Sequence, residues 1–249
     1  MDVHPLRGAD PAPVSIVVPG PQGVVEHVAL AQSSFGVHGG YSIYLPAGYG
    51  RAPERRYPVV YLLHAGSSSD SFFLDLGVRQ VIDAAVVSGA VGPMILVLVD
   101  GGPKFTGDGH AEASFGDYVA ADLLPDVDAR WRTVAERRGR AIGGISLGGR
   151  YALEFAAEHP SLVAAVGGHS TSIPHSPERL AGVSIPIYLD VGESDALFAR
   201  DEALATNLRR LGADVRWNPA EGGHTGTYWT AHLGDYLRFY SDALGAGSR

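Results

Sequence analysis

Ser146 is the residue whose surroundings most clearly predict chemistry. It is the centre of Gly144-Ile145-Ser146-Leu147-Gly148, the only Gly-x-Ser-x-Gly in the sequence. The apolar residues 140–145 before it are typical of a strand, and residues 151–157 after it are typical of a helix. A tight strand-to-helix turn with small neighbours exposes the serine hydroxyl as a nucleophile. Because the chain contains 33 glycines, the pentapeptide alone is weak evidence, and partner residues are needed.

A serine hydroxyl needs an adjacent base, and His224 is the best candidate. It lies in the glycine-rich residues 221–226, directly after the last predicted strand, where an imidazole can reach back over the edge of a sheet. His169 and His175 precede the candidate acids, which breaks the usual chain order of serine, acid and histidine. His232 falls inside a predicted helix. We therefore predict that His224 is the base.

The base in turn needs a carboxylate that fixes its tautomer and stabilises the imidazolium. The acid should lie between Ser146 and His224, just past the end of a strand. Asp195 satisfies both conditions, because it follows the predicted strand at residues 185–191. Asp190, which is still inside the apolar run, and Glu193 remain alternatives. A buried structural role is the competing interpretation for Asp190.

An oxyanion hole requires two backbone N–H groups near the nucleophile. We predict that Leu147, directly after the serine, supplies one of them. The second should come from the loop after an earlier strand, and Gly66 or Ala65 lies at that place. His64 precedes this loop, and we interpret it as a support for the loop rather than a reacting group.

Strands and helices must alternate along the chain to position these residues. Strands are predicted at residues 14–18, 24–30, 41–45, 59–63, 94–99, 140–145, 162–167, 185–191 and 214–218. Helices are predicted at residues 72–87, 117–131, 151–157, 196–211 and 227–244. This alternation predicts an α/β fold with a doubly wound, mostly parallel sheet and antiparallel N-terminal strands. The long loop at residues 101–116 is a candidate for lining a pocket.

The composition narrows the remaining alternatives. The chain has 249 residues, which suits a single domain spanning residues 1–249, and we expect residues 1–12 and 245–249 to be flexible. A net charge of −8 argues against nucleic acid or an anionic membrane as the main partner.

There is no cysteine, no histidine spacing typical of a metal site and no nucleotide-binding glycine loop, so we expect neither metal nor cofactor. Because the first residues lack a signal-peptide pattern, we expect a soluble cytoplasmic protein of unknown oligomeric state.

Several stretches together resemble the esterases of the α/β-hydrolase fold, a family that includes feruloyl and acetyl-xylan esterases, S-formylglutathione hydrolases and mycolyltransferases. The similar stretches cover most of the chain from Val24 onward. They are residues 41–49, residues 56–64, residues 122–133, the motif around Ser146, and Gly222-Gly223-His224 with Tyr228-Trp229. The resemblance implies an α/β-hydrolase fold and hydrolysis of a carboxylic ester through an acyl-serine, without a cofactor. It assigns Ser146, Asp195 and His224 as the triad, and Leu147 with Gly66 as the oxyanion hole.

Two departures from the family pattern leave the substrate open. The usual glycine-rich run after the histidine of the oxyanion strand is here Ala65-Gly66-Ser67-Ser68-Ser69, and the usual tryptophan two residues after the catalytic histidine is here Gly226. We expect a small ester to bind near His169, Tyr228 and Trp229. There are two alternative functions. The protein could be an acyltransferase that uses the same acyl-serine, or a hydrolase-fold binding protein without catalytic activity.

Overall fold

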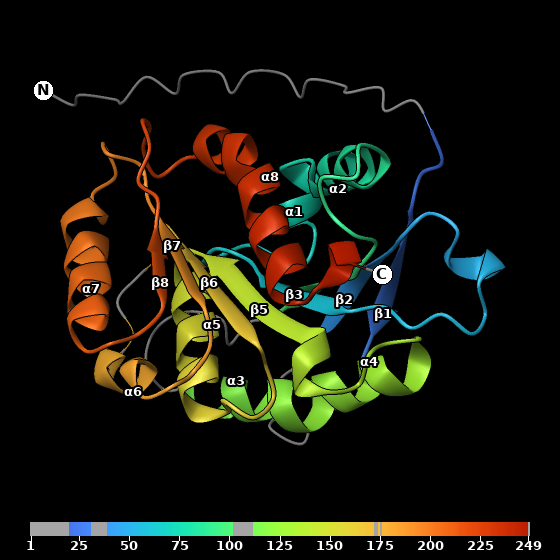
Figure 1. Ribbon diagram of the computed structural model, residues 1–249, viewed down its shortest axis with the longest axis horizontal. Helices are drawn as coiled ribbons and strands as arrows, with labels where there is room; N and C mark the ends of the chain where they lie inside the picture. Colours follow the sequence, from blue (N-terminus) through green and yellow to red (C-terminus); the bar gives the residue numbers. More distant parts are fainter. Residues whose placement is uncertain (1–19, 31–38, 102–111, 172–173, 175, 249) are drawn as a thin grey trace, which may run out of the picture.

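One eight-stranded mixed sheet forms the centre of the computed structural model, which describes residues 20–30, 39–101, 112–171, 174 and 176–248 (Figure 1). The strand order is β1-β2-β4-β3-β5-β6-β7-β8. The strands are β1 (Val24–Ala29), β2 (Gly40–Leu45), β3 (Val59–Leu63), β4 (Ile95–Asp100), β5 (Arg140–Ile145), β6 (Ala165–His169), β7 (Ile187–Asp190) and β8 (Val215–Trp217). The pairs β1–β2 and β2–β4 are antiparallel and all others are parallel, as the sequence predicts.

The central strands are largely apolar because both faces of the sheet are covered. In β3, Val59, Tyr61 and Leu63 pack on one face, whereas Val60 and Leu62 pack on the other. Since successive side chains of a strand alternate between faces, each strand contributes side chains to two separate cores, one on each face of the sheet. Because β3 to β8 are parallel, their carboxyl ends lie at one edge of the sheet, where ligand-binding groups are expected.

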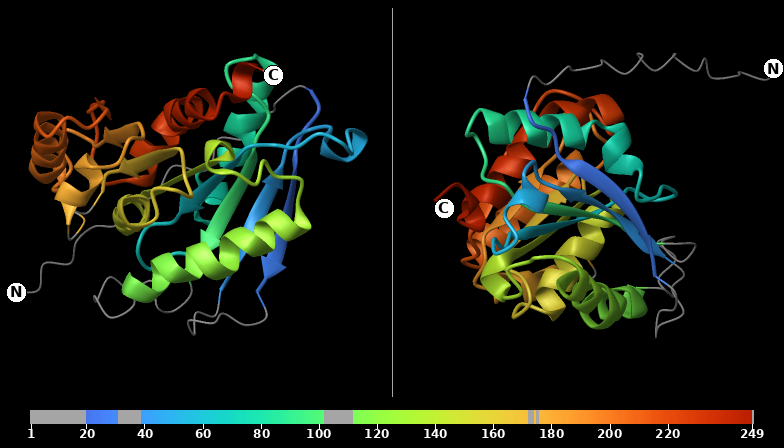
Figure 2. Two further views of the ribbon diagram at one scale, coloured as in Figure 1. Left: turned by 60° about the horizontal axis from the view of Figure 1, so that its bottom comes forward. Right: turned by 90° about the vertical axis from the view of Figure 1, so that its right-hand side faces the viewer.

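Two layers of helices cover the sheet (Figures 1 and 2). One layer consists of α1 (Phe72–Asp75), α2 (Val78–Val87) and α8 (Gly226–Ala243). The other contains α3 (Glu112–Tyr118), η3 (Val119–Leu123), α4 (Leu124–Arg130), α5 (Leu147–Glu158), α6 (Pro177–Ala181) and α7 (Phe198–Arg210). Short 3₁₀ turns are η1 (Tyr49–Arg51), η4 (Arg137–Gly139) and η5 (Ala246–Ser248). None of the helices in the described part of the chain combines the length and the apolarity that a membrane span requires.

Two predicted helices differ from the structure at their ends. The helix predicted at residues 72–87 is divided into α1 and α2 at Gly77, whose φ of 85° interrupts the helical backbone. The helix predicted at residues 117–131 begins earlier, at Glu112, and contains the π-helical turn η3 before Pro125. Residues 112–116 of the predicted loop are therefore helical, and Phe115 is buried against Tyr151.

The end of the described chain packs against the body of the molecule. Ala246 lies in η5 and is buried, and its carbonyl packs so closely on Gly92 that no Cβ would fit there. Leu244 and Ala246 are both buried. The predicted strand at residues 14–18 and most of the loop at residues 101–116 lie outside the described residues.

Candidate active site

Ser146 stands between the end of β5 and the start of α5 in a strained backbone conformation. Its φ of 55° and ψ of −117° are unfavourable for a residue with a side chain. The turn is held by close backbone contacts: a Cβ on Gly148 would lie 2.2 Å from the carbonyl oxygen of Leu63, and one on Gly144 would lie 2.4 Å from the carbonyl carbon of Gly148. Only glycine fits at both places, as the nucleophile motif predicts.

The structure brings Ser146, His224 and Asp195 into one hydrogen-bonded chain. His224 Nε2 lies 3.1 Å from Ser146 Oγ, and His224 Nδ1 lies 2.7 Å from Asp195 Oδ2. Asp195 Oδ1 accepts a second hydrogen bond, from the N–H of Leu197 at 2.8 Å. The Asp195 side chain is fully buried, whereas that of His224 is 36% exposed. This arrangement can pass the hydroxyl proton of Ser146 to an imidazole oriented by a carboxylate.

The segments that carry Asp195 and His224 are joined by backbone hydrogen bonds. Glu193 N–H donates to the carbonyl of Ala220 at 2.8 Å, and Ser194 N–H donates to that of Gly222, also at 2.8 Å. The N–H of Ala220 returns a bond to the carbonyl of Val191 at 3.2 Å. The loop after β7 and the loop after β8 therefore form one hydrogen-bonded unit.

His64 connects the loop after β3 to the end of β4. The N–H of Gly101 donates to His64 Nε2 at 3.3 Å, so Nδ1 carries the proton and donates to the carbonyl of Ala65 at 2.7 Å. Burial lowers the pKa of His64, which keeps the imidazole neutral. Gly66 follows Ala65 in the chain, and a Cβ on Gly66 would lie 3.5 Å from Leu147 Cδ2. The two predicted oxyanion donors are therefore neighbours.

Comparison with known proteins identifies the chain. Residues 33–240 match the family model described as "Putative esterase". The chain belongs to this esterase family. An esterase of Mycobacterium tuberculosis is 36% identical over 149 residues, which are 55% of this chain and 30% of the relative. The endo-1,4-beta-xylanase Y of Acetivibrio thermocellus is 29% identical over 153 residues, which are 56% of this chain and 13% of the relative. The chain thus spans less than a third of the length of these two relatives.

Solved structures confirm the α/β-hydrolase fold of this chain. A ferulic acid esterase aligns with a TM-score of 0.80 and 24% identity, covering 90% of this chain and 100% of that one. The S-formylglutathione hydrolase of Staphylococcus aureus aligns with a TM-score of 0.73 and 15% identity, covering 90% and 99%. The resemblance stated from the sequence motifs is therefore confirmed.

Asp190 and His169 are buried beneath this site and form a hydrogen-bonded pair. Asp190 is buried, with its Oδ1 2.6 Å from His169 Nδ1, and its Oδ2 accepts hydrogen bonds from Tyr236 at 2.8 Å and Tyr228 at 3.0 Å. His169 Nε2 lies 3.0 Å from the hydroxyl of Tyr240. Burial and the charge of Asp190 raise the pKa of Tyr228 and Tyr236, so both phenols remain protonated donors. We name these five residues the Asp190 cluster.

The Asp190 cluster contains two of the three residues predicted to lie near the substrate, His169 and Tyr228. His169 is 0% exposed and Tyr228 is 3% exposed, so neither lines an open surface for a substrate. Their side chains point toward Asp190 because α8 packs over β6 and β7, which the sequence pattern does not reveal. Trp229 is also buried, and its Nε1 donates a hydrogen bond to Ser170 Oγ. Its ring lies edge-on to the imidazole of His224, with 5.0 Å between the ring centroids. Trp229 thus contacts the predicted base.

Thr225, the residue directly after His224, fixes the start of α8 and was not predicted from the sequence. Thr225 begins α8 as its N-cap, and its hydroxyl accepts a hydrogen bond from the N–H of Tyr228. A threonine directly before a helical pattern is a recognisable capping signal. Among the described residues, no group of three or more histidine and acidic side chains could hold a metal ion.

Proposed function

We propose that this protein is a serine esterase that cleaves a carboxylic ester through an acyl-serine intermediate. The hydrogen-bonded chain from Asp195 through His224 to Ser146 is the observation that carries this proposal. Membership of the esterase family supports it independently. The described fold serves as a single catalytic domain.

His224 acts first as a base and then as an acid. Its Nε2 accepts the proton of Ser146 while Oγ attacks the ester carbonyl carbon, and it then donates that proton to the departing alcohol. Asp195 stabilises the imidazolium without becoming protonated itself. Water, deprotonated by the same imidazole, attacks the acyl-serine and releases the carboxylic acid.

The N–H groups of Leu147 and Gly66 stabilise the oxyanion in this proposal. Leu147 is the first residue of α5, where backbone N–H groups have no partner within the helix. The carbonyl of Ala65 is held by His64, and the described chain contains no cis peptide bond. Because a trans peptide points its N–H away from its C=O, the N–H of Gly66 is directed away from His64. This geometry favours Gly66 over Ala65 as the second donor.

The Ser146→Ala variant tests the proposed mechanism. Loss of the nucleophile should lower the turnover of p-nitrophenyl acetate by about 10⁴–10⁶-fold, with the circular dichroism spectrum unchanged. Ser88→Ala, at an exposed hydroxyl that donates to the carbonyl of Ala85, is the matched control and should retain full activity. Full activity in Ser146→Ala would disprove the mechanism.

Two further measurements separate the alternatives. Labelling of Ser146 by a fluorophosphonate, identified by mass spectrometry, distinguishes an active serine hydrolase from a silent binding protein. Product analysis with and without added alcohols distinguishes hydrolysis from acyl transfer. The substrate panel should include alkyl and aryl esters, since one structural neighbour is named a ferulic acid esterase.

A further inference from the structure

Trp229, in the first turn of α8, contacts three segments around the candidate active site. The centroid of its ring is 5.0 Å from that of the His224 imidazole, and the two rings are nearly perpendicular, at 85°. The same ring lies 5.9 Å from that of Phe72 in α1, the helix that follows the loop containing Gly66. Its Nε1 donates a hydrogen bond to Ser170 Oγ at 3.0 Å, just past the end of β6. One buried indole thus connects the segment of the proposed base to two neighbouring segments.

Ser170 offers this indole a fixed acceptor. Its φ of 45° lies in the left-handed region, which a residue with a side chain keeps only where the surrounding structure holds it. Ser170 is buried, and its N–H donates to the carbonyl of Asp190 at 2.8 Å. The preceding residue, His169, accepts a backbone hydrogen bond from the N–H of Ser146, also at 2.8 Å. The hydroxyl that fixes Trp229 therefore belongs to the residue next to the backbone partner of the proposed nucleophile.

Backbone hydrogen bonds fix the loop that carries His224 but not the tilt of its imidazole. The side chain of His224 is 36% exposed. Its bonds to Asp195 and Ser146 restrain the ring only weakly against rotation about the line that joins its two nitrogens. A nearly perpendicular aromatic ring opposes this rotation, because edge-to-face rings attract each other and resist closer approach.

We propose that Trp229 is a positioning residue for His224, and that Ser170 holds the indole in place through its hydrogen bond. The inference rests on the proposed function, since it concerns the reaction at Ser146. Its effect is largest in the acyl-enzyme, where Ser146 Oγ carries the acyl group and no longer donates a proton to His224 Nε2. The bond to Asp195 and the contact with Trp229 then keep Nε2 directed at the position from which water attacks.

Pre-steady-state hydrolysis of p-nitrophenyl acetate tests this inference, because the burst of p-nitrophenol reports acylation and the steady phase reports deacylation. Trp229→Phe keeps an apolar ring but loses the Nε1 donor, and Ser170→Ala loses the acceptor. Each should slow deacylation by about tenfold and acylation by about threefold or less, because small misplacements of a catalytic group are costly. The double variant should resemble Trp229→Phe, since both substitutions remove the same hydrogen bond.

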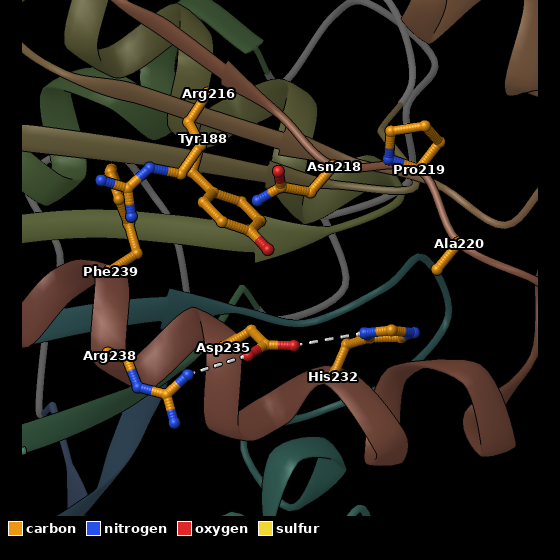
Figure 3. A pocket seen from close by; sticks show the side chains of 9 residues that line it. All are labelled: Tyr188, Arg216, Asn218, Pro219, Ala220, His232, Asp235, Arg238 and Phe239. Atoms are coloured by element: carbon orange, nitrogen blue, oxygen red, sulfur yellow. Dashed lines mark hydrogen bonds and ion pairs between the residues drawn. The ribbon is translucent and has the colours of Figure 1, made fainter. Parts of the chain in front are cut away.

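Phe239→Leu is the matched control, because Phe239 is another buried aromatic residue of α8. Its ring centroid lies 5.2 Å from that of Tyr188, beside a groove that none of the three triad residues lines (Figure 3). Urea unfolding should show that this variant is destabilised at least as much as Trp229→Phe. Its deacylation rate should nevertheless remain that of the parent protein.

Two results overturn the inference. One is unchanged deacylation in Trp229→Phe, and the other is equal slowing in Phe239→Leu, which would reduce the effect to the stability of α8. Labelling of Ser146 by a fluorophosphonate separates these results from failure of the proposed function. If the parent protein is labelled and Trp229→Phe turns over as the parent does, only the inference fails. If the parent protein is neither labelled nor active, the proposed function fails and the inference fails with it.

Discussion

Gly148 is the residue on which the position of Ser146 depends most closely. It is the second residue of α5, and it lies directly against the carbonyl oxygens of Leu63 and His64 at the end of β3. The nucleophile turn and the strand that leads to Gly66 therefore touch through this glycine. A side chain here would separate the two predicted oxyanion donors.

Gly148→Ala should abolish activity and destabilise the fold by more than about 3 kcal/mol, because its Cβ would lie 2.2 Å from the Leu63 carbonyl oxygen. Urea unfolding and ester hydrolysis measure the two effects. Gly234→Ala is the matched control, since a Cβ at this position of α8 meets nothing within 4 Å. That variant should be neutral or stabilised by up to about 1 kcal/mol. Equal stability of the two variants would contradict the packing argument.

At this scale the three residues proposed as the triad are hydrogen-bonded to one another, whereas their buried surroundings could not be predicted from the sequence. Ser146, Asp195 and His224 follow from chain order, because parallel strands bring their carboxyl ends to one edge of the sheet. The direction of the His169 side chain could not be predicted in the same way. It depends on the packing of α8 across β6 and β7, which brings Tyr236 to 3.6 Å from the imidazole, measured between ring centroids.

At the scale of elements, the Asp190 cluster attaches α8 to the sheet. Asp190 ends β7, five residues before Asp195, and it accepts hydrogen bonds from two tyrosines of α8, the helix that begins two residues after His224. The acid and the base of the proposed triad thus depend on one buried carboxylate. Its three donors satisfy the buried charge.

Tyr236→Phe tests this attachment. Removal of a donor to the buried Asp190 should cost about 1.5–3 kcal/mol of folding stability and lower kcat severalfold with little change in KM. Tyr118→Phe is the control, because the Tyr118 hydroxyl is buried without a hydrogen-bond partner among the described residues. The control should be neutral or slightly stabilised. An unchanged kcat in a destabilised Tyr236→Phe would restrict the cluster to a structural role.

The elements themselves were predicted well where periodicity was strong. The buried strands at residues 59–63 and 140–145 agree with β3 and β5, because uninterrupted apolar runs are distinctive. The interruption at Gly77 and the π-helical turn η3 were not predicted. Both depend on local backbone geometry that residue types specify only weakly.

At the scale of the whole molecule, Asp201 links the fold to pH. It lies in α7, is 0% exposed, and accepts a hydrogen bond from the N–H of Thr171. Burial raises the pKa of its carboxyl to about 8, although the bond from Thr171 opposes this change, and the charges of Asp195 and Asp190 add to it. The folded protein therefore holds a proton on Asp201 that the unfolded chain releases near its ordinary pKa of 3.8.

Folding stability should therefore fall as the pH rises from about 4 to about 8, and Asp201→Asn should remove this decrease. Between these pH values the native state binds one more proton, which gives a slope of at most about 1.4 kcal/mol per pH unit. Urea unfolding at pH 5 and pH 8 measures the difference. Asp201→Asn should gain stability over the parent protein as the pH rises, and parallel profiles for the two proteins would contradict this assignment.

The backbone bonds between the loops after β7 and β8 limit how this site can move. Asp195 cannot separate from His224 by a loop swing alone, because the bonds from Glu193, Ser194 and Ala220 would have to break together. Such an event is local unfolding, which is much rarer than ordinary loop fluctuation. We therefore expect any gate that admits a substrate to Ser146 to belong to other segments, and we expect Asp195 and His224 to stay hydrogen-bonded throughout the proposed catalytic cycle.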